Sequence, residues 1–464
     1  IALGISMTVN WLSEIKQFYG MMLALIMFLG VSYIFICSMF DPLKVYISTT
    51  IFLFMINPMI LIGRISEYIG GVGAGKFYLG VSHVSLLLGL ISYFICKFKY
   101  PERQLFGFGK HEIYLLIFTC LTIISAVIAP YKAASYSQLN LYLTLFALYI
   151  LWSNSLKHID RNKLINLILV TFSLIAILQL CISLMQILKG MQLGIQFLGE
   201  GEVFPRQGTP FPSITGTFMH PGPLSLFFII CMSLFFPFVL QKHNFLTVIG
   251  FFSAMIGLVL TFSRTSLLIS VVILFLEWFL MKVVSKGLSM KRVFLIAAVI
   301  LLIIVIFRGN ITSRFLNLEN ASTDNQVENR LVHYQMAWDY IQRKPLFGYG
   351  LNNWSYVSKQ LQLSTVPGSN IFHYNNPVHN IYLYLWFEGG IILLAGFLFV
   401  VISSIISLLK KIRVGNDFEI GLYTSILCVL MYGFTGWGLF NSGQMLYGFY
   451  FILALSGLKT VSDL

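Results

Sequence analysis

Residues 380–408 read NIYLYLWFEGGIILLAGFLFVVISSIISL, a run in which Glu388 is the single charged residue. A helix needs about 20 consecutive, mostly apolar residues to cross the hydrocarbon core of a bilayer. This run is longer than that, and its charge lies in the first third. We therefore interpret it as a membrane-spanning helix.

The same pattern recurs along the chain. Of its 464 residues, 58% are hydrophobic and 10% are charged, and the mean hydropathy is +0.84. Soluble domains carry roughly 25% charged residues. The apolar runs lie at approximately 21–40, 45–62, 77–96, 112–129, 137–153, 164–188, 222–240, 245–262, 266–281, 293–307, 380–408, 420–440 and 445–458. The sequence predicts an all-α integral membrane protein, a polytopic bundle of about 13–14 transmembrane helices that forms one domain over residues 1–464.

The net charge of +13 reflects basic residues in the short connectors. In a soluble protein this charge would favour nucleic-acid binding, but beside apolar runs it sets topology instead. The basic set of connectors holds Lys44; Lys97, Lys99, Arg103 and Lys110; Lys157, Arg161 and Lys163; Lys242; Lys282, Lys286, Lys291 and Arg292; Lys410, Lys411 and Arg413; and Lys459. We expect this set and the C-terminus to be cytoplasmic, and the alternate connectors to lie outside.

The chain begins with the apolar fragment Ile1–Ile5. We expect this fragment to be the tail of a first helix, which would give both ends of the intact protein a cytoplasmic location. No basic n-region or small-residue cleavage site indicates a signal peptide. The six cysteines lie in or at the ends of apolar runs, which is typical of small buried residues and not of a disulfide framework.

Two predicted outer connectors, 189–221 and 308–379, are much longer than usual helix connections. Residues 328–342 of the second have a helical pattern, with Leu331, Tyr334, Trp338 and Ile341 on one stripe. Pro345 ends this pattern, and Gly348-Tyr349-Gly350 follows as a tight turn. We expect an amphipathic helix that packs this stripe on the outer ends of the spans.

Four outer residues are candidates for function: Arg206, Arg264, Arg330 and His379. Arg264 stands in Ser263-Arg264-Thr265, between two apolar runs with almost no loop, and a charge held at the membrane boundary favours a functional role. Each also has an ordinary explanation. Arg264 can extend to lipid phosphates, Arg206 can order its loop, Arg330 can form a surface ion pair, and His379 can cap the next helix.

Together the four residues suit one reaction. Arginines bind a diphosphate bidentately, and a neutral histidine accepts a proton from a sugar hydroxyl. Aromatic residues, whose faces suit sugar rings, are frequent in the same connectors: Phe197, Phe204, Phe211, Phe218, Trp338, Trp354, Tyr356, Phe372 and Tyr374. The pattern favours glycosyl transfer from a lipid diphosphate carrier. His373 and His379 lack a carboxylate or thiolate partner at a ligand spacing, so we predict no metal.

The chain resembles the O-antigen ligase and O-antigen polymerase superfamily in several short motifs. The matching elements are Asn329-Arg330 through Trp338, Lys344-Pro345-Leu346-Phe347-Gly348-Tyr349-Gly350-Leu351, His379-Asn380-Ile381-Tyr382-Leu383, Glu388-Gly389-Gly390, Ser263-Arg264-Thr265, and Arg206 with Gly216-Thr217-Phe218 and Pro221. They appear in the family's order between residues 206 and 390. Gly390 is followed by Ile391-Ile392-Leu393, where the family often has Gly-x-x-Gly, so ligase and polymerase both remain open.

The resemblance implies a GT-C-like fold in the bacterial cytoplasmic membrane, with the active site facing outward. It implies an undecaprenyl-diphosphate-linked glycan donor, a glycan or lipid-glycan acceptor, and catalysis without metal or other cofactor. Flippase or chain-length regulator proteins are the partners it suggests. The catalytic residues would be His379, Arg264 and Arg330, and the substrate-binding residues would be Arg206, Arg264, Arg330, Tyr334 and Trp338.

Two other classes of function remain in view. A transporter or flippase for lipid-linked glycan needs polar residues near the membrane midplane, whereas this chain places its charges at the outer boundary and in a long outer connector. A scaffold without catalysis leaves the arginines and the histidine unexplained. For the transferase we expect Arg264 and Arg330 to approach each other. We also expect a cavity that opens sideways to the outer leaflet and is lined by Arg206, Arg264, Arg330 and His379.

Overall fold

The computed structural model describes residues 29–54, 60–64, 76–103, 107–203, 211–241, 244–284, 325–360, 369, 371–413, 417–436, 438–441 and 443–458. Within these residues, seven helices are long and apolar enough to cross a membrane. They are α3 (Val81–Lys99), α4 (Lys110–Ile128), α5 (Lys132–Leu156), α6 (Arg161–Lys189), α7 (Pro221–Gln241), α9 (Arg264–Val284) and α15 (Ile381–Ile412). The predicted all-α polytopic membrane fold is confirmed.

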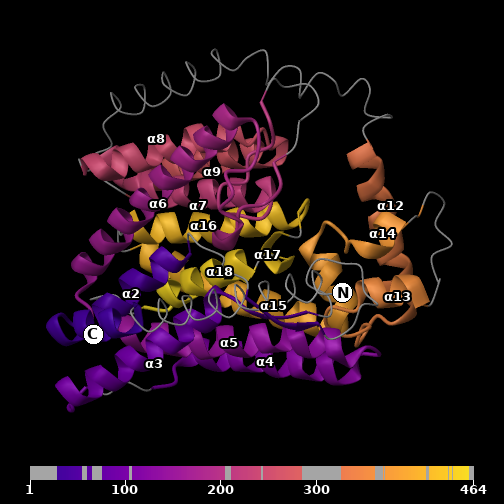
Figure 1. The fold of residues 1–464 in the computed structure, drawn as a ribbon, viewed down its shortest axis with the longest axis horizontal. Coiled ribbons are helices and arrows are strands. Elements are labelled where there is room, and N and C mark those ends of the chain that lie inside the picture. Colours follow the sequence, from indigo (N-terminus) through magenta and orange to yellow (C-terminus); the bar gives the residue numbers. More distant parts are fainter. Residues whose placement is uncertain are drawn as a thin grey trace, which may run out of the picture.

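Shorter elements complete the described fold (Figure 1). The shorter helices that pack among the spans are Leu29–Met39, α2 (Pro42–Leu53), α8 (Phe245–Leu260), α16 (Asp417–Gly433), α17 (Gly438–Asn441) and α18 (Gly443–Ser456). The two long connectors, 189–221 and 308–379, carry η1 (Gln196–Leu198), α12 (Asn325–Arg343), α13 (Trp354–Gln360) and α14 (Ile371–Asn375). The apolar run 293–307, the polar stretch 308–324 and Arg206 lie outside the described residues.

One apolar run differs from the prediction. The span expected over 45–62 is helical only as far as Leu53, and Ile60–Arg64 forms strand β1, which pairs antiparallel with β2 (Lys76–Leu79). The sequence signal for the difference is Asn57-Pro58, because proline breaks helical hydrogen bonding and disfavours helical geometry in the residue before it. Hydropathy alone does not register this signal.

Helix α7 forms the centre of the bundle. It is apolar on all sides, and its membrane-spanning window is 100% buried by α6, α8, α9 and α16. Small residues on the neighbouring helices let them approach closely. A Cβ on Gly257 of α8 would lie 2.3 Å from the Phe228 ring, and one on Gly421 of α16 would lie 2.8 Å from Ser233 O. An all-round apolar helix is stable only in such a buried position.

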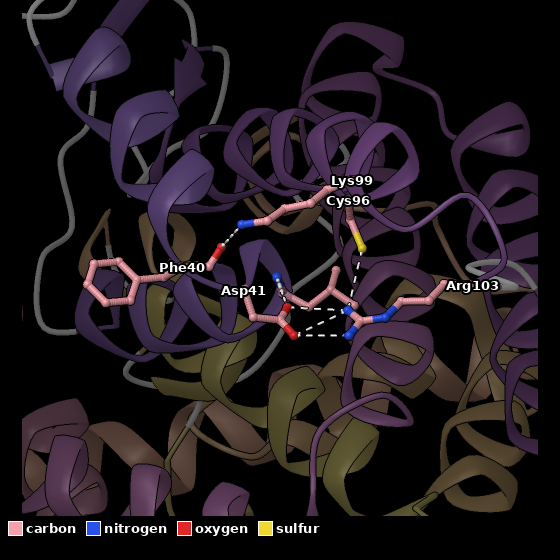
Figure 2. Close-up of polar contacts among 6 residues, drawn as sticks. Phe40, Asp41, Cys96, Lys99 and Arg103 are labelled. Carbon is pink, nitrogen blue, oxygen red and sulfur yellow. Dashed lines mark hydrogen bonds and ion pairs between the residues drawn. The ribbon is translucent and has the colours of Figure 1, made fainter.

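Contacts join the basic connectors to one another at one end of the bundle. Figure 2 shows one example, in which Arg103 donates to Asp41 from both terminal nitrogens, each 3.2 Å from Oδ2. Asp41 in turn accepts from Leu43 N (3.0 Å) and caps α2, while Lys99 Nζ donates to Phe40 O (3.1 Å). These contacts hold the end of the helix Leu29–Met39 and the start of α2 against the end of α3.

Further contacts extend this basic end across the molecule. They are the ion pairs of Lys157 with Glu112 (3.8 Å) and of Arg161 with Glu419, and the hydrogen bond from Lys411 Nζ to Ser456 O (2.6 Å). Every one of these basic residues belongs to the set that we predict to be cytoplasmic. The other connectors meet at the opposite end, where Gln444 Nε2 donates to Phe54 O (2.7 Å). We call that opposite end, which carries α12 to α14, the loop end.

Candidate functional site

The loop end is organised by a break in α15. Gly389 and Gly390 have non-helical dihedrals, and the φ of Gly390 is +69°, a value that favours glycine. A Cβ on Gly390 would lie 1.9 Å from Leu346 O, and one on Gly348 would lie 2.4 Å from Phe387 O. Both glycines are therefore required for the turn after α12 to reach the break.

The turn replaces hydrogen bonds that α15 loses at the break. The bonds run from Tyr349 N to Phe387 O (2.8 Å), from Gly350 N to Glu388 O (2.7 Å) and from Ile391 N to Pro345 O (2.9 Å). Unpaired backbone groups are costly at membrane depth. The turn and the span thus form one hydrogen-bonded unit, and the helix that precedes the turn is held in a fixed place.

Glu388 belongs to this unit. Its side chain is fully buried, and its Oε1 accepts from Asn352 N at 2.6 Å, while its backbone oxygen also accepts from Ser125 Oγ of α4 at 2.9 Å. These contacts attach the end of the turn to two spans. They give Glu388 a structural role at the break.

Helix α12 forms as predicted but packs a different face. Its buried side chains are Val332, His333, Met336, Ala337, Tyr340 and Ile341. Of the predicted stripe, Ile341 is buried and Tyr334 is partly buried, whereas Leu331 is 56% exposed and Trp338 is 47% exposed. The expected packing face was wrong because apolar residues occur on two sides of this helix, and sequence spacing does not decide which side is covered.

Asn380, and not His379, caps α15. The Asn380 side chain accepts from Tyr382 N (2.9 Å) and Leu383 N (3.1 Å), and its backbone is extended. This is the usual geometry of an asparagine N-cap. The sequence left open that His379 caps this helix, but its neighbour Asn380 is the cap, so capping does not explain His379.

Tyr334 ties α12 to the start of α15. Its hydroxyl donates to Phe434 O at 3.1 Å and lies 3.4 Å from His379 O. Arg330 lies one turn earlier on the same helix and is close enough for its charge to lower the pKa of His379. The structure thus brings together Arg330, Tyr334 and His379 from two elements that are far apart in the sequence.

Three histidines gather here, and two of them are structural. The ring centroid of His333 lies 4.7 Å from that of His373 and 5.5 Å from that of His379. His333 and His373 are 0% and 1% exposed, whereas His379 is partly exposed. Within the described part of the chain, no group of three or more His, Cys, Asp or Glu side chains is arranged to hold a metal ion. His379 is the one of these three histidines whose side chain is partly exposed.

The surroundings keep His379 neutral. Burial, followed by the charges of His333, Arg330 and His220, lowers its pKa to about 3. Burial and the proximity of His373 lower the pKa of His333 to about 4. Arginine lowers the pKa of His379 as expected, but burial is the larger cause. At neutral pH the ring of His379 is therefore uncharged.

Two residues near His379 or Arg330 did not enter the sequence-based candidate set. His220 precedes α7 and contributes to the field at His379, and its Nδ1 accepts from Gly222 N at 3.1 Å. Tyr432, at the end of α16, lies within electrostatic range of Arg330, and a Cβ on Gly222 would be 2.5 Å from its hydroxyl. His220 stands inside the motif that contains Gly216 and Pro221, which was an available signal. Tyr432 had none.

Arg264 starts α9 after a turn of only three residues from the end of α8. Ser266 Oγ, two residues further on, lies 2.7 Å from Ser225 Oγ of α7. Phe211, from the first long connector, stacks on Phe262 with centroids 6.1 Å apart. Arg264 is therefore at the loop end, joined through α7 to the helix start that carries His220.

Other predicted residues have different places. Trp338 lies on the exposed side of α12. Trp354 is buried and donates from Nε1 to His373 O (3.0 Å), and Phe218 is fully buried, so neither presents a face to a sugar. Tyr356 stacks on Tyr131 with centroids 5.4 Å apart.

Comparison with known proteins supports the resemblance. No curated protein matches the chain. A family model described as O-Antigen ligase matches residues 249–398. The matched segment begins in α8 and ends in α15, so it contains Arg264, Arg330 and His379, while Arg206 precedes it. The resemblance predicted from the motifs is confirmed over this segment of the membrane protein, because residues 249–398 match the O-Antigen ligase family model.

Proposed function

We propose that this protein is a glycosyltransferase of a bacterial cytoplasmic membrane, with its active site at the loop end and facing outward. The family match supports a membrane glycan ligase or polymerase role. The observation that carries the finer proposal is the proximity of Arg330 to a neutral, partly exposed His379 inside the matched segment, where Tyr334 ties their two elements together.

In the proposed reaction an acceptor sugar hydroxyl attacks the anomeric carbon of an undecaprenyl-diphosphate-linked glycan. The hydroxyl proton passes to a ring nitrogen of His379, and the bond between the anomeric carbon and the diphosphate oxygen breaks. A general base must be neutral and within hydrogen-bond reach of the proton before it can accept it. The low pKa of His379 supplies the neutral form, and the proton is later released to water.

The leaving diphosphate gains negative charge as this bond breaks. Cationic donors that are already in place stabilise such charge most effectively. Arg330 and Arg264 are assigned this role, since planar guanidinium groups pair bidentately with phosphate oxygens. Arg206 and Tyr334 are assigned to substrate binding, whereas the exposed Trp338 receives no role in the reaction. The reaction as proposed needs no metal.

The test is transfer by the purified protein in nanodiscs, with a synthetic undecaprenyl-diphosphate oligosaccharide as donor and EDTA in the buffer. The expected products are free undecaprenyl diphosphate and an extended or transferred glycan. Offering donor alone, or donor with a separate lipid-glycan acceptor, distinguishes polymerase from ligase. Movement of intact donor across vesicle membranes, without cleavage of its diphosphate bond, would identify a flippase instead.

A further inference from the structure

Helix α12 and the turn after it leave four large apolar side chains uncovered on one side. Leu331 is 56% exposed, Trp338 47%, Leu346 57% and Phe347 54%. We call these four residues the outer ridge. An exposed apolar cluster of this kind usually marks a surface that a protein partner or a membrane covers.

The ridge reaches the depth at which neighbouring spans face lipid. Its turn is bonded to α15 at the break, and Ser125 of α4 donates to the Glu388 backbone oxygen at the same level. Around Ser125, α4 exposes Ile124 (47%), Val127 (57%) and Ile128 (44%), and just past the break α15 exposes Ile391 (37%). In candidate spans, such exposed aliphatic stripes are the lipid-facing surface. Leu346 and Phe347 therefore lie level with the outer part of that surface.

A tryptophan pair joins the ridge directly to α15. The rings of Trp338 and Trp386 meet edge to face with centroids 5.9 Å apart, and Trp386 Nε1 donates to Pro345 O at 3.0 Å. Indole rings concentrate where a bilayer meets water, because they combine an apolar body with a polar N–H group. The apolar surface thus continues from α15 onto α12 through Trp386 and Trp338.

The rest of the exposed stripe suits the headgroup layer rather than the hydrocarbon core. Gln335 and Gln342 alternate with the apolar residues, and Arg343 and Lys344 are exposed where α12 meets the turn. Helices that lie in a membrane interface combine apolar residues with polar and basic ones in this way. Basic side chains at that level contact the phosphates of lipid headgroups.

We infer that the outer ridge is immersed in the interfacial layer of the bilayer, so that α12 is a membrane-surface helix whose covering partner is phospholipid. The opposite face of α12 carries His333, and Arg330 lies on the same helix, so lipid contact on the ridge fixes where these residues stand. The inference rests on the membrane fold and on the described contacts, and it holds whatever reaction the site performs.

The test places a photoreactive benzoyl derivative of phenylalanine at Phe347, and separately at Leu331, in protein reconstituted into nanodiscs of mixed anionic and zwitterionic phospholipid. Phe399, 50% exposed on α15, is the lipid-facing control, and Glu202, an exposed charged residue of the first long connector, is the water-facing control. Mass spectrometry after irradiation identifies the adducts. We expect phospholipid adducts at Phe347 and Leu331 in yields within about twofold of Phe399, and few at Glu202.

Phe347 and Leu331 are exposed, so replacing either with a large aromatic leaves the packed core intact, and elution as a monodisperse peak verifies the fold. Adducts between two copies of the chain would show that self-association covers the ridge and would overturn the inference. Yields as low as those at Glu202, with Phe399 labelled normally, would overturn it as well. Because lipid contact is the readout, failure here leaves the proposed transfer reaction untouched.

Discussion

The hydroxyl of Tyr334 lies 3.4 Å from the backbone oxygen of His379 and also donates to Phe434 O at 3.1 Å. This single side chain fastens the helix that carries Arg330 to the loop that carries His379 and to the end of α16. The relative position of the proposed base and the proposed diphosphate ligand therefore depends on a tyrosine that performs no proton transfer itself.

Tyr334→Phe should remove this fastening and leave the ring in place. A net hydrogen bond is worth about 0.5–1.5 kcal/mol, so we expect transfer to fall roughly two- to tenfold. Steady-state kinetics with the lipid-linked donor measure the change. Tyr356→Phe, which keeps the stacking on Tyr131, is the matched control and should stay near wild type. Unchanged turnover in Tyr334→Phe would show that the contact does not position the site.

Arg264→Lys and Arg330→Lys should each lose most activity, because a lysine keeps the charge but not the planar fork. By analogy with the removal of one oxyanion donor, each change should cost about 2–4 kcal/mol of transition-state stabilisation. Donor binding should weaken too. The control is Lys189→Arg, at the end of α6. Wild-type turnover in either lysine variant, at normal expression, would remove the arginine from the mechanism.

His379 and Asn380 are adjacent and should respond in opposite ways. His379→Ala should abolish transfer while donor binding persists, since the proposed base acts on the acceptor. Asn380→Ala should lower thermal stability through the lost cap, which is worth about 0.5–2 kcal/mol, with a smaller effect on turnover. Transfer assays, donor-binding measurements and melting curves separate the two. Near-normal transfer by folded His379→Ala would refute its role as base.

His333 should make stability depend on pH. Its folded pKa is about 4, below the ordinary histidine value of about 6.5, so the unfolded chain binds the proton more readily. The contribution of the neutral His333 to the free energy of unfolding is therefore full above pH 6.5. It declines as the pH falls toward 4, by up to about 3 kcal/mol. Melting temperatures recorded across this range should fall, and His333→Asn should make the fall shallower, leaving the part that His379 contributes through its own lowered pKa. An equally steep decline in that variant would assign the effect to other groups.

The sidedness predicted from Lys and Arg can be tested at two exposed glutamates. Glu202 is in the first long outer connector, and Glu102 is in the basic connector after α3. With the exposed native cysteines Cys120 and Cys181 replaced by serine, an impermeant thiol reagent should label Glu202→Cys in intact cells. It should label Glu102→Cys only after permeabilisation. The reverse pattern would invert the topology and place the proposed site in the cytoplasm.

Hydropathy and charge predicted most of the architecture because both follow directly from the bilayer as solvent. Long apolar runs became helices, and the basic connectors meet at one end through contacts such as Arg103 with Asp41. The run 45–62 failed because backbone geometry, and not hydropathy, ends that helix after Leu53. Motif order also predicted the family segment correctly.

The site was less accessible to sequence reasoning. Periodicity found α12 but could not decide between its two apolar faces, since the choice depends on the break in α15. Asn380, and not His379, caps α15 because of its extended backbone and the direction of its side chain, which sequence spacing does not reveal. Tyr432 reaches the site from α16 only because the bundle places that helix end beside the start of α7.

The break at Gly389 and Gly390 has a consequence for how the segment that matches the family model can be divided. Three main-chain hydrogen bonds of the span are completed by the turn from Pro345 to Gly350. A soluble fragment of the long connector would lose these partners and uncover the apolar face of α12, while a span grafted without its own turn would carry unpaired peptide groups into lipid. Chimeras between relatives should therefore exchange the connector and the first half of α15 as one cassette, with their junctions placed beyond Ile391.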